Sequence, residues 1–326
     1  MPRPSEDSLI ARYFAPLAAE GGLGLRDDAA CIAPQAGHDL VLTKDALVSR
    51  VHFLPDDAPG SIARKALGVN VSDLAAKGAE PVGFLLGLAL PENWTEDWLA
   101  AFAHGLGEAA REWRCPLLGG DTVKASGELT LSVTALGQVP SGTMVRRSGA
   151  KPGDLVCTTG TIGDAALGLL LRREPAWAGR LSAEHRAHLA DRYLHPRPRI
   201  DFATALREHA HAAMDVSDGL LGDLAKLCRA SGVSGVIDEE RVPLSAAAAV
   251  VVGIEGSLLE RALTGGDDYE ILCTLPPERL DAAQADARRM GLALTTIGAI
   301  EDGSDPPRIR GRGGERPITG GSFSHF

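Results

Sequence analysis

The sequence predicts an α/β protein that is divided into two domains. Its 326 residues correspond to about two domains of ordinary size, and 44 % of them are hydrophobic, which is sufficient for a substantial core. Apolar residues recur at helical spacing in some segments and follow strand patterns in others, along both halves of the chain. A polar segment that contains glycine and proline, residues 146–153, separates the halves. We therefore predict one domain over residues 1–145 and another over residues 146–326.

In the first half, helices and short strands are expected to alternate. Helical spacing of apolar residues predicts helices at 7–20, 61–77 and 96–113. Gly78 and Pro81 follow the second of these segments, as is typical of helix ends. Apolar runs and alternating segments predict strands at 29–33, 39–44, 84–90 and 128–139.

The second half continues this alternation. Strands are expected at 154–158, 212–216, 270–275 and 292–300. Helices are expected at 164–172, 183–193, 199–209, 219–230 and 277–290, and the alanine run 246–249 is also expected to be helical.

Composition excludes several functional classes. The net charge of −10 disfavours broad nucleic-acid binding, which depends on Lys and Arg to neutralise phosphates. The longest uncharged apolar stretches, such as residues 82–90, fall well short of the roughly 20 residues that span a bilayer, and no secretory signal is recognisable. The five cysteines form no CxxC pair, which fits a reducing compartment. We therefore expect a cytoplasmic protein with no nucleic-acid or membrane partner.

Several aspartates occur where a charge is costly. Four of them are expected at the end of a strand-like run or in the turn after it: Asp28, Asp45, Asp121 and Asp215. A fifth, Asp73, lies in an otherwise apolar helical segment and shares a helix face with Asn70. A carboxylate buried without a partner is disfavoured by several kcal/mol. Each aspartate alone can be a cap or turn residue, but the five together favour a site for a hard cation.

The segment Asp215-Val216-Ser217-Asp218-Gly219 is the sharpest local motif. It follows a strand-like run and precedes a helical one, so Ser217 or Asp218 can cap the helix. One carboxylate would suffice for capping. Two carboxylates and a hydroxyl at this spacing suit coordination of Mg²⁺ by oxygen atoms, in which the ion also bridges to substrate phosphates.

Two glycine-rich turns are compatible with phosphate binding, although each alone is more often structural. Residues 160–164 join a strand to a helix, so backbone N–H groups there can hold a phosphate, and residues 265–270 precede a strand. No GxxxxGK[ST] motif occurs, which excludes a Walker-type nucleotide site. His185 and His188 lie one helical turn apart without an HExxH set, so we expect a solvated helix face there rather than a zinc site.

A series of short segments shares its order, spacing and identity with a known family. The segments are 8–14, 27–30, 45–48, 51–53, 70–75, 119–122, 147–154, 215–220, 265–270 and 325–326. Through them the chain resembles the thiamine-monophosphate kinases of the PurM-like superfamily, which is typified by aminoimidazole ribonucleotide synthetase. The resemblance implies an α/β (α+β), two-domain PurM-like fold. In that fold the N-terminal domain forms a dimer β-barrel, and the C-terminal domain has a mixed sheet with helices.

The resemblance also implies an activity. The family transfers the γ-phosphoryl group of ATP directly and in line to the phosphate of thiamine monophosphate, which gives thiamine diphosphate and ADP with the assistance of several Mg²⁺ ions. Both reactants are polyanions, and this explains a cluster of acidic metal ligands. The acceptor phosphate has a second pKa of about 6, so it needs no strong general base near neutral pH. A homodimer formed through the N-terminal domains is expected.

Individual roles follow from the same resemblance. Metal ligands would be Asp28, Thr43, Asp45, Asp73, Asp121, Asp215 and Asp218, and Asp45, Asp121 and Asp215 would be catalytic. ATP would contact Gly120, Asp121, Arg147 and Ser217. The thiamine substrate would contact His52, Asp267 and Phe323. This chain differs from the family's usual pattern at three positions, where Lys44 replaces a hydroxyl residue, Asp267 a glutamate, and Phe323 a tryptophan or tyrosine.

Two other functions stay open. An ATP-dependent PurM-like synthetase or kinase could act on a different phosphorylated acceptor; its selenophosphate and hydrogenase-maturation branches are disfavoured because their reactive N-terminal residue and C-terminal cysteine do not occur here. A non-catalytic binder of nucleotide or thiamine phosphate is the second alternative, although binding alone does not require so many carboxylates.

Overall fold

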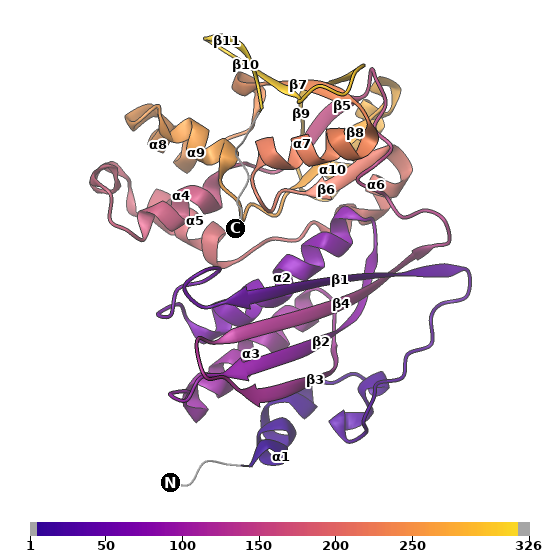
Figure 1. The fold of residues 1–326 in the computed structure, drawn as a ribbon, viewed down its shortest axis with the longest axis vertical. Helices are drawn as coiled ribbons and strands as arrows, with labels where there is room; N and C mark the ends of the chain where they lie inside the picture. The colour runs from indigo at the N-terminus through magenta and orange to yellow at the C-terminus, as the bar shows by residue number, and fades with distance from the viewer. Residues whose placement is uncertain (1–4, 319–326) are drawn as a thin grey trace. The chain divides into compact units, whose positions relative to one another are not determined.

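The chain forms two compact units. In the computed structural model, which describes residues 5–318, unit 1 comprises Met1–Leu74 with Ala79–Thr143, and unit 2 comprises Ala75–Gly78 with Met144–Phe326. Each unit has its own sheet and its own covering helices (Figure 1). Both are mixed α/β structures, as the sequence predicts.

Unit 1 is built on a four-stranded sheet in the order β1-β4-β2-β3. The strands are β1 (His38–Val48), β2 (Glu80–Leu90), β3 (Leu117–Lys124) and β4 (Thr130–Pro140). Only the β2–β3 pair is parallel. The long helices α2 (Pro59–Ala76) and α3 (Glu96–Glu112) lie along one face of this sheet (Figure 1). Gly78, with φ +70°, follows α2 and turns the chain toward β2.

The other face of the unit 1 sheet carries exposed apolar side chains. Leu42 on β1 is 62 % exposed, and Leu85 on β2 is 39 % exposed. The strand register pairs Leu42 with Leu136 of β4, so these residues share the face opposite α2 and α3. Val123 of β3, which is paired with Ala89 of β2, extends the same apolar surface.

The N-terminal segment is more irregular than the pattern predicts. The helix expected at 7–20 is only partly confirmed. Helical turns run from α1 (Glu6–Leu9) through Ile10–Phe14 to Ala15–Leu17, are interrupted at Ala18, and resume as a 3₁₀ segment at Glu20–Leu25. Pro16 lacks an N–H donor, and Ala18 becomes extended and bridges to Leu117. The strand expected at 29–33 is wrong; the N–H of Cys31 instead donates to the carbonyl of Gly21 at 2.8 Å.

Unit 2 contains a seven-stranded sheet in the order β11-β10-β7-β9-β5-β8-β6. The strands are β5 (Leu155–Thr159), β6 (Ala212–Asp215), β7 (Ser234–Asp238), β8 (Ile271–Leu275), β9 (Leu294–Glu301), β10 (Arg308–Gly311) and β11 (Gly314–Pro317). The helices are α4 (Asp164–Leu171), α5 (Ala183–Leu194), α6 (Ala203–His209), α7 (Leu220–Ser231), α8 (Ala246–Ile254), α9 (Leu258–Thr264) and α10 (Leu280–Arg289). Short 3₁₀ turns occur at Ala176–Arg180, Ile200–Phe202, Glu239–Arg241 and Pro277–Arg279.

The core of unit 2 lies on both faces of its sheet. One cluster joins Val156 and Leu272 to the apolar side of α7, and a second joins the next residues in the strands, Cys157 and Cys273, to α6 and α10. This division follows from the alternation of side chains along a strand. A third cluster holds α4, α5, α8 and α9 together (Figure 1).

Most of the other expected elements are confirmed. The helices expected at 61–77 and 96–113 are α2 and α3, and the second-half helices and strands occur within a few residues of their expected bounds. Four strands, β3, β7, β10 and β11, and the helix α9 were not among the expected elements. All five cysteines are free thiols. Among residues 5–318, no helix is long and apolar enough to span a membrane.

Candidate active site

The first group of expected site residues lies where β1 meets α2. Thr43 donates a hydrogen bond from its hydroxyl to the carboxylate of Asp73, and Asn70 accepts one from the N–H of Asp45 at 3.0 Å. The polar stripe within α2 therefore faces β1, which explains why an otherwise apolar helix carries an amide and a carboxylate. Asp45 lies within β1, opposite Val133, so the expectation that it ends a strand is wrong.

A second group lines a cavity of about 810 Å³ within unit 1. Asp28, Gly120 and Asp121 line it together with Lys44, and Phe14 and Leu117 are part of its apolar wall. Asp121 is in the middle of β3, paired with Gly87, and not at a strand end as expected. At Gly120 an added Cβ would overlap the carbonyl oxygen of Leu86, so the close approach of β3 to β2 requires glycine.

Lys44 lies in sequence between Thr43 and Asp45, two members of the first group, but faces away from them. Successive strand residues point to opposite faces, so Thr43 and Asp45 point to the α2 side while Lys44 points to the other face. There its ammonium donates to the hydroxyl of Ser132 at 2.5 Å. Among the described residues that line the cavity, Lys44 is the one with a positive charge, and it shares the space with Asp28 and Asp121.

His52 follows β1 in a turn. Its N–H donates to the carbonyl of Val48, and its Nδ1 accepts from the N–H of Val48, both at 3.0 Å. Because Nδ1 is an acceptor, the proton of the neutral ring is on Nε2. The turn thus fixes both the position and the tautomer of this expected substrate contact.

In unit 2, Asp215 ends β6 as expected. The loop that follows it is held by Asp223, which was not among the expected site residues. Neither Ser217 nor Asp218 caps α7; instead Asp223, in the first turn of α7, accepts from the N–H groups of Ser217 at 3.1 Å and Asp218 at 3.0 Å. Lys226 donates to Asp223 at 2.8 Å and also to Asp218. Burial raises the pKa of Asp223, and the ammonium of Lys226 opposes that rise.

A second loop lies against this one. The N–H groups of Asp267 and Tyr269 donate to the carbonyls of Ser217 and Val216, both at 2.9 Å. The N–H of Val216 returns a bond of 2.8 Å to the carbonyl of Glu270. The structure therefore brings Asp215, Ser217, Asp218 and Asp267 to adjacent loops of one unit, although these residues come from two distant parts of the chain.

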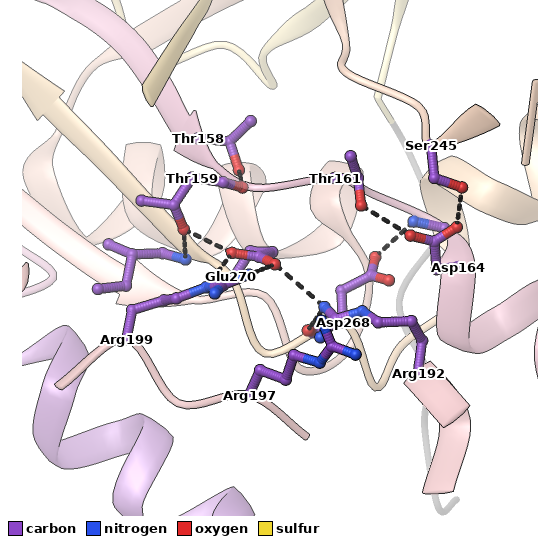
Figure 2. Close-up of polar contacts among 12 residues, drawn as sticks. Thr158, Thr159, Thr161, Asp164, Arg192, Arg197, Arg199, Ser245, Asp268 and Glu270 are labelled. Atoms are coloured by element: carbon purple, nitrogen blue, oxygen red, sulfur yellow. Dashed lines mark hydrogen bonds and ion pairs between the residues drawn. The ribbon is translucent and has the colours of Figure 1, made fainter. Parts of the chain in front are cut away.

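A buried ionic network supports the second loop (Figure 2). Glu270 accepts hydrogen bonds from Arg192 at 3.0 Å, from Arg199 at 2.7 Å and from Thr159 at 2.8 Å. The neighbouring Asp268 is fully buried and accepts from the N–H of Gly163 at 2.8 Å. Burial raises the pKa of Asp268 well above its ordinary value, with the charge of Arg192 acting in the opposite direction.

The glycine-rich turn at 160–164 is structural. The N–H groups of Gly160 and Ile162 donate to the carbonyls of Ala293 and Pro243, and Gly163 donates to Asp268. Protein acceptors occupy these three donors, which favours the structural interpretation of this turn. The expectation for His188 is wrong in part, since its Nε2 lies 3.1 Å from the buried carboxylate of Asp164.

Arg147 is not among the residues of these groups, and Phe323 cannot be assigned to any of them. Arg147 is exposed, and its carbonyl accepts a hydrogen bond from the hydroxyl of Ser231 at 3.3 Å. Phe323 lies outside the described residues. No local motif in the sequence predicts the other residues that hold these loops, above all Arg192, Arg199 and Asp223. Arg199 and Glu270, for example, are 71 positions apart in the chain.

Known proteins resemble this chain over most of its length. Residues 26–139 match the N-terminal domain of AIR synthase related proteins, and residues 151–307 match the C-terminal domain. The thiamine-monophosphate kinase of Caulobacter vibrioides is 42 % identical over 305 residues, which cover 92 % of this chain and 85 % of the relative.

Two solved structures extend the resemblance to the fold. A thiamine-monophosphate kinase from Stenotrophomonas maltophilia, 40 % identical, superposes with a TM-score of 0.81 and covers 89 % of this chain and 90 % of its own. The complex of AaThiL with AMPPCP and TMP, 32 % identical, has a TM-score of 0.79 and covers 98 % of this chain and 94 % of its own. The two-domain PurM-like fold expected from the sequence is confirmed, and the chain belongs to the thiamine-monophosphate kinase family of phosphotransferases.

Proposed function

We propose that this protein transfers the γ-phosphoryl group of ATP to the phosphate of thiamine monophosphate, with release of ADP and formation of thiamine diphosphate. The observation that carries the proposal is the convergence of Asp28, Gly120 and Asp121 on one cavity of unit 1. Family membership supports it, as does the relative solved with AMPPCP and TMP.

The nucleotide is proposed to bind in the unit 1 cavity. Its volume of about 810 Å³ is within the range of ligand sites, and its two walls differ in chemistry. Phe14 and Leu117 offer apolar surface to a base, while Lys44 offers a positive charge to a phosphate. Gly120 has no side chain, so a phosphate can approach the backbone of β3 closely.

Mg²⁺ is proposed to be held by oxygen ligands at two places in unit 1. One is the pair Thr43 and Asp73 together with Asp45, and the other is Asp28 with Asp121 in the cavity. Hydroxyl and carboxylate oxygens are the donors that this hard cation prefers, so these residues fit it. When bound, the ion would neutralise phosphate charge and thereby permit two polyanions to approach.

Roles are also proposed for residues of unit 2. Arg147 and Ser217 would contact ATP, and Asp215 and Asp218 would be further metal ligands. His52 of unit 1 would contact the thiamine phosphate with the Nε2 proton that its turn leaves on the ring. Asp267 and Phe323 would contact the thiamine portion.

The transfer is proposed to be direct and in line. An oxygen of the thiamine phosphate forms a bond to the γ-phosphorus, the bond from that phosphorus to the bridging oxygen of ADP breaks, and the electron pair of that bond leaves with ADP. The attacking oxygen is anionic near neutral pH, so the protein need not remove a proton. Its contribution is alignment and charge neutralisation.

A homodimer is proposed to form through the open face of the unit 1 sheet. Leu40, Leu42 and Val123 are large apolar residues exposed on it. An apolar surface of this kind on a sheet is typical of an interface. A second copy with the same surface would bury these residues around a two-fold axis.

The purified protein should convert thiamine monophosphate to thiamine diphosphate when supplied with ATP and Mg²⁺, as measured by product mass. Asp121→Asn and Asp215→Asn should each lower kcat/KM by at least a factor of about 100, as the loss of a main electrostatic group does. Glu108→Gln, an exposed residue on α3, is the matched control. Full activity of both aspartate variants, or ADP release only with another acceptor, would contradict the proposal.

A further inference from the structure

The loop that carries Asp267 has an unfavourable backbone. Asp267 and Tyr269 have φ angles of +72° and +51°, in the left-handed region that side chains with a Cβ rarely adopt. Only seven non-glycine residues of the described chain have a positive φ, and two of them are in this six-residue segment, 265–270. Such a conformation persists only where the surroundings impose it, and it is concentrated at functional sites.

Backbone contacts account for part of this restraint. The N–H groups of Asp267 and Tyr269 both bond to the loop that follows β6. At Gly266 an added Cβ would overlap the carbonyl oxygen of Ser217, so the two loops approach as closely as backbones can. The bonds at Asp267 and Tyr269 and the close packing at Gly266 therefore restrain the backbone of this loop.

The side chain of Glu270 supplies the rest of the restraint. Its carboxylate is fully buried and is shared by Arg192, Arg199 and Thr159, as Figure 2 shows. Thr159 also accepts from the N–H of Ile271 at 2.8 Å, which ties the base of the loop to β5. Arg192 donates a second bond of 3.0 Å to the carbonyl of Asp268, inside the loop itself. Charge-assisted bonds of this kind, to a carboxylate that is fully buried, hold a backbone firmly.

Tyr269 links this rigid frame to Asp267. Its ring is buried, and its hydroxyl donates a hydrogen bond of 3.0 Å to a carboxylate oxygen of Asp267. The left-handed backbone at both residues is what turns the phenol of Tyr269 back toward a side chain only two positions away. Asp267 itself is half-buried, so its carboxylate is oriented and still accessible.

We propose that Tyr269 and Glu270 are positioning residues for the acceptor substrate: Tyr269 orients the carboxylate of Asp267, and Glu270, held by Arg192 and Arg199, keeps the loop in the conformation that makes this contact possible. The inference rests on the proposed contact of Asp267 with thiamine monophosphate. It assigns no role in nucleotide binding to either residue, so substitution should change KM for thiamine monophosphate and KM for ATP to different extents.

The first test is Tyr269→Phe, which removes one oxygen atom and keeps the buried ring. We expect KM for thiamine monophosphate to rise about tenfold, as for the loss of one hydrogen bond to a charged group, while KM for ATP and the melting temperature change little. When Tyr269→Phe is added to the variant Asp267→Asn, KM for thiamine monophosphate should change much less, because the two residues act as a unit. Tyr13→Phe, which removes a hydroxyl bonded to Glu96 in unit 1, is the control.

The second test addresses the bonds that Arg199 makes to Glu270. Arg199 is partly exposed, so Arg199→Gln should fold; we expect KM for thiamine monophosphate to rise at least about fivefold, and Arg199→Lys to restore part of the loss because it keeps the charge. Arg197→Gln, two positions away and bonded to Asp191 at the surface, should leave both KM values unchanged.

Equal changes in both KM values, or a lowered melting temperature with unchanged KM, would overturn the inference and leave a purely structural network. Calorimetric titration with thiamine monophosphate keeps the test independent of turnover: weaker binding by Tyr269→Phe supports it, and identical binding overturns it. A wild-type protein that binds thiamine monophosphate but makes no diphosphate would instead contradict the proposed kinase function.

Discussion

Thr43 on β1 and Asp73 on α2 are joined by a hydrogen bond across 30 positions of sequence. The bond links a strand to the helix that covers it, and it brings a hydroxyl and a carboxylate to one place beside Asp45. In a protein that is proposed to bind two polyanions, such an oxygen-rich contact suits a divalent cation.

The Thr43 hydroxyl should therefore influence the metal dependence of the reaction. Thr43→Val keeps the shape of the side chain but leaves Asp73 without this donor, and it removes a proposed ligand. We expect the Mg²⁺ concentration that gives half-maximal activity to rise about tenfold, and Thr43→Ser to resemble the wild type. Activity measured against Mg²⁺ at fixed ATP provides the test; identical curves for all three proteins would exclude Thr43 as a ligand.

Lys44 should contribute to nucleotide affinity. It is the positively charged residue among the described residues lining the unit 1 cavity, and its partner Ser132 is neutral. Lys44→Met should weaken binding of AMPPCP about tenfold, because an ammonium near a phosphate is lost, and should leave KM for thiamine monophosphate unchanged. Lys124→Met, which removes an exposed partner of Glu92, is the control for charge alone. Unaltered AMPPCP affinity would show that Lys44 does not reach the nucleotide.

Asp268 should make stability depend on pH. Burial raises its pKa in the folded protein well above the ordinary 3.8, so the folded state keeps this proton at pH values where the unfolded state has lost it. Stability from this group is therefore greatest below about pH 4 and falls as the pH rises. Asp268→Asn removes the titration, so its free energy of unfolding should improve relative to the wild type between about pH 4 and pH 7. Urea unfolding across this range measures the difference in free energy of unfolding between the variant and the wild type, and Asp281→Asn is the exposed control. A difference that stays constant with pH would show that the pKa of Asp268 is not raised.

The open face of the unit 1 sheet should govern oligomeric state. Leu42→Asp places a charge at its most exposed leucine, and burying that charge in an interface is costly. We expect the mass measured by light scattering to fall to that of one chain, whereas Val250→Asp, at an exposed apolar position on α8, should not change it. A wild type that is already a single chain would contradict the dimer proposal.

The sequence by itself determined the class of the fold, most of its elements and the family. Periodicity predicted α2, α3 and most elements of unit 2, because burial of one face of a helix or strand leaves a direct mark on residue order. The motif around Asp215 was readable for the same reason, since its residues are consecutive and end a strand. The strand expected over 29–33 did not form, because the N–H of Cys31 bonds to the carbonyl of Gly21 rather than to a neighbouring strand.

Only the tertiary structure decided which polar residues meet. It separated Lys44 from its neighbours Thr43 and Asp45 across a sheet, joined Glu270 to Arg199 over 71 positions, and made Asp223 rather than Ser217 the holder of the loop after β6. Local patterns record which face of an element is buried, but the partner of a buried charge is chosen by packing between distant segments, where desolvation makes each unpaired group costly.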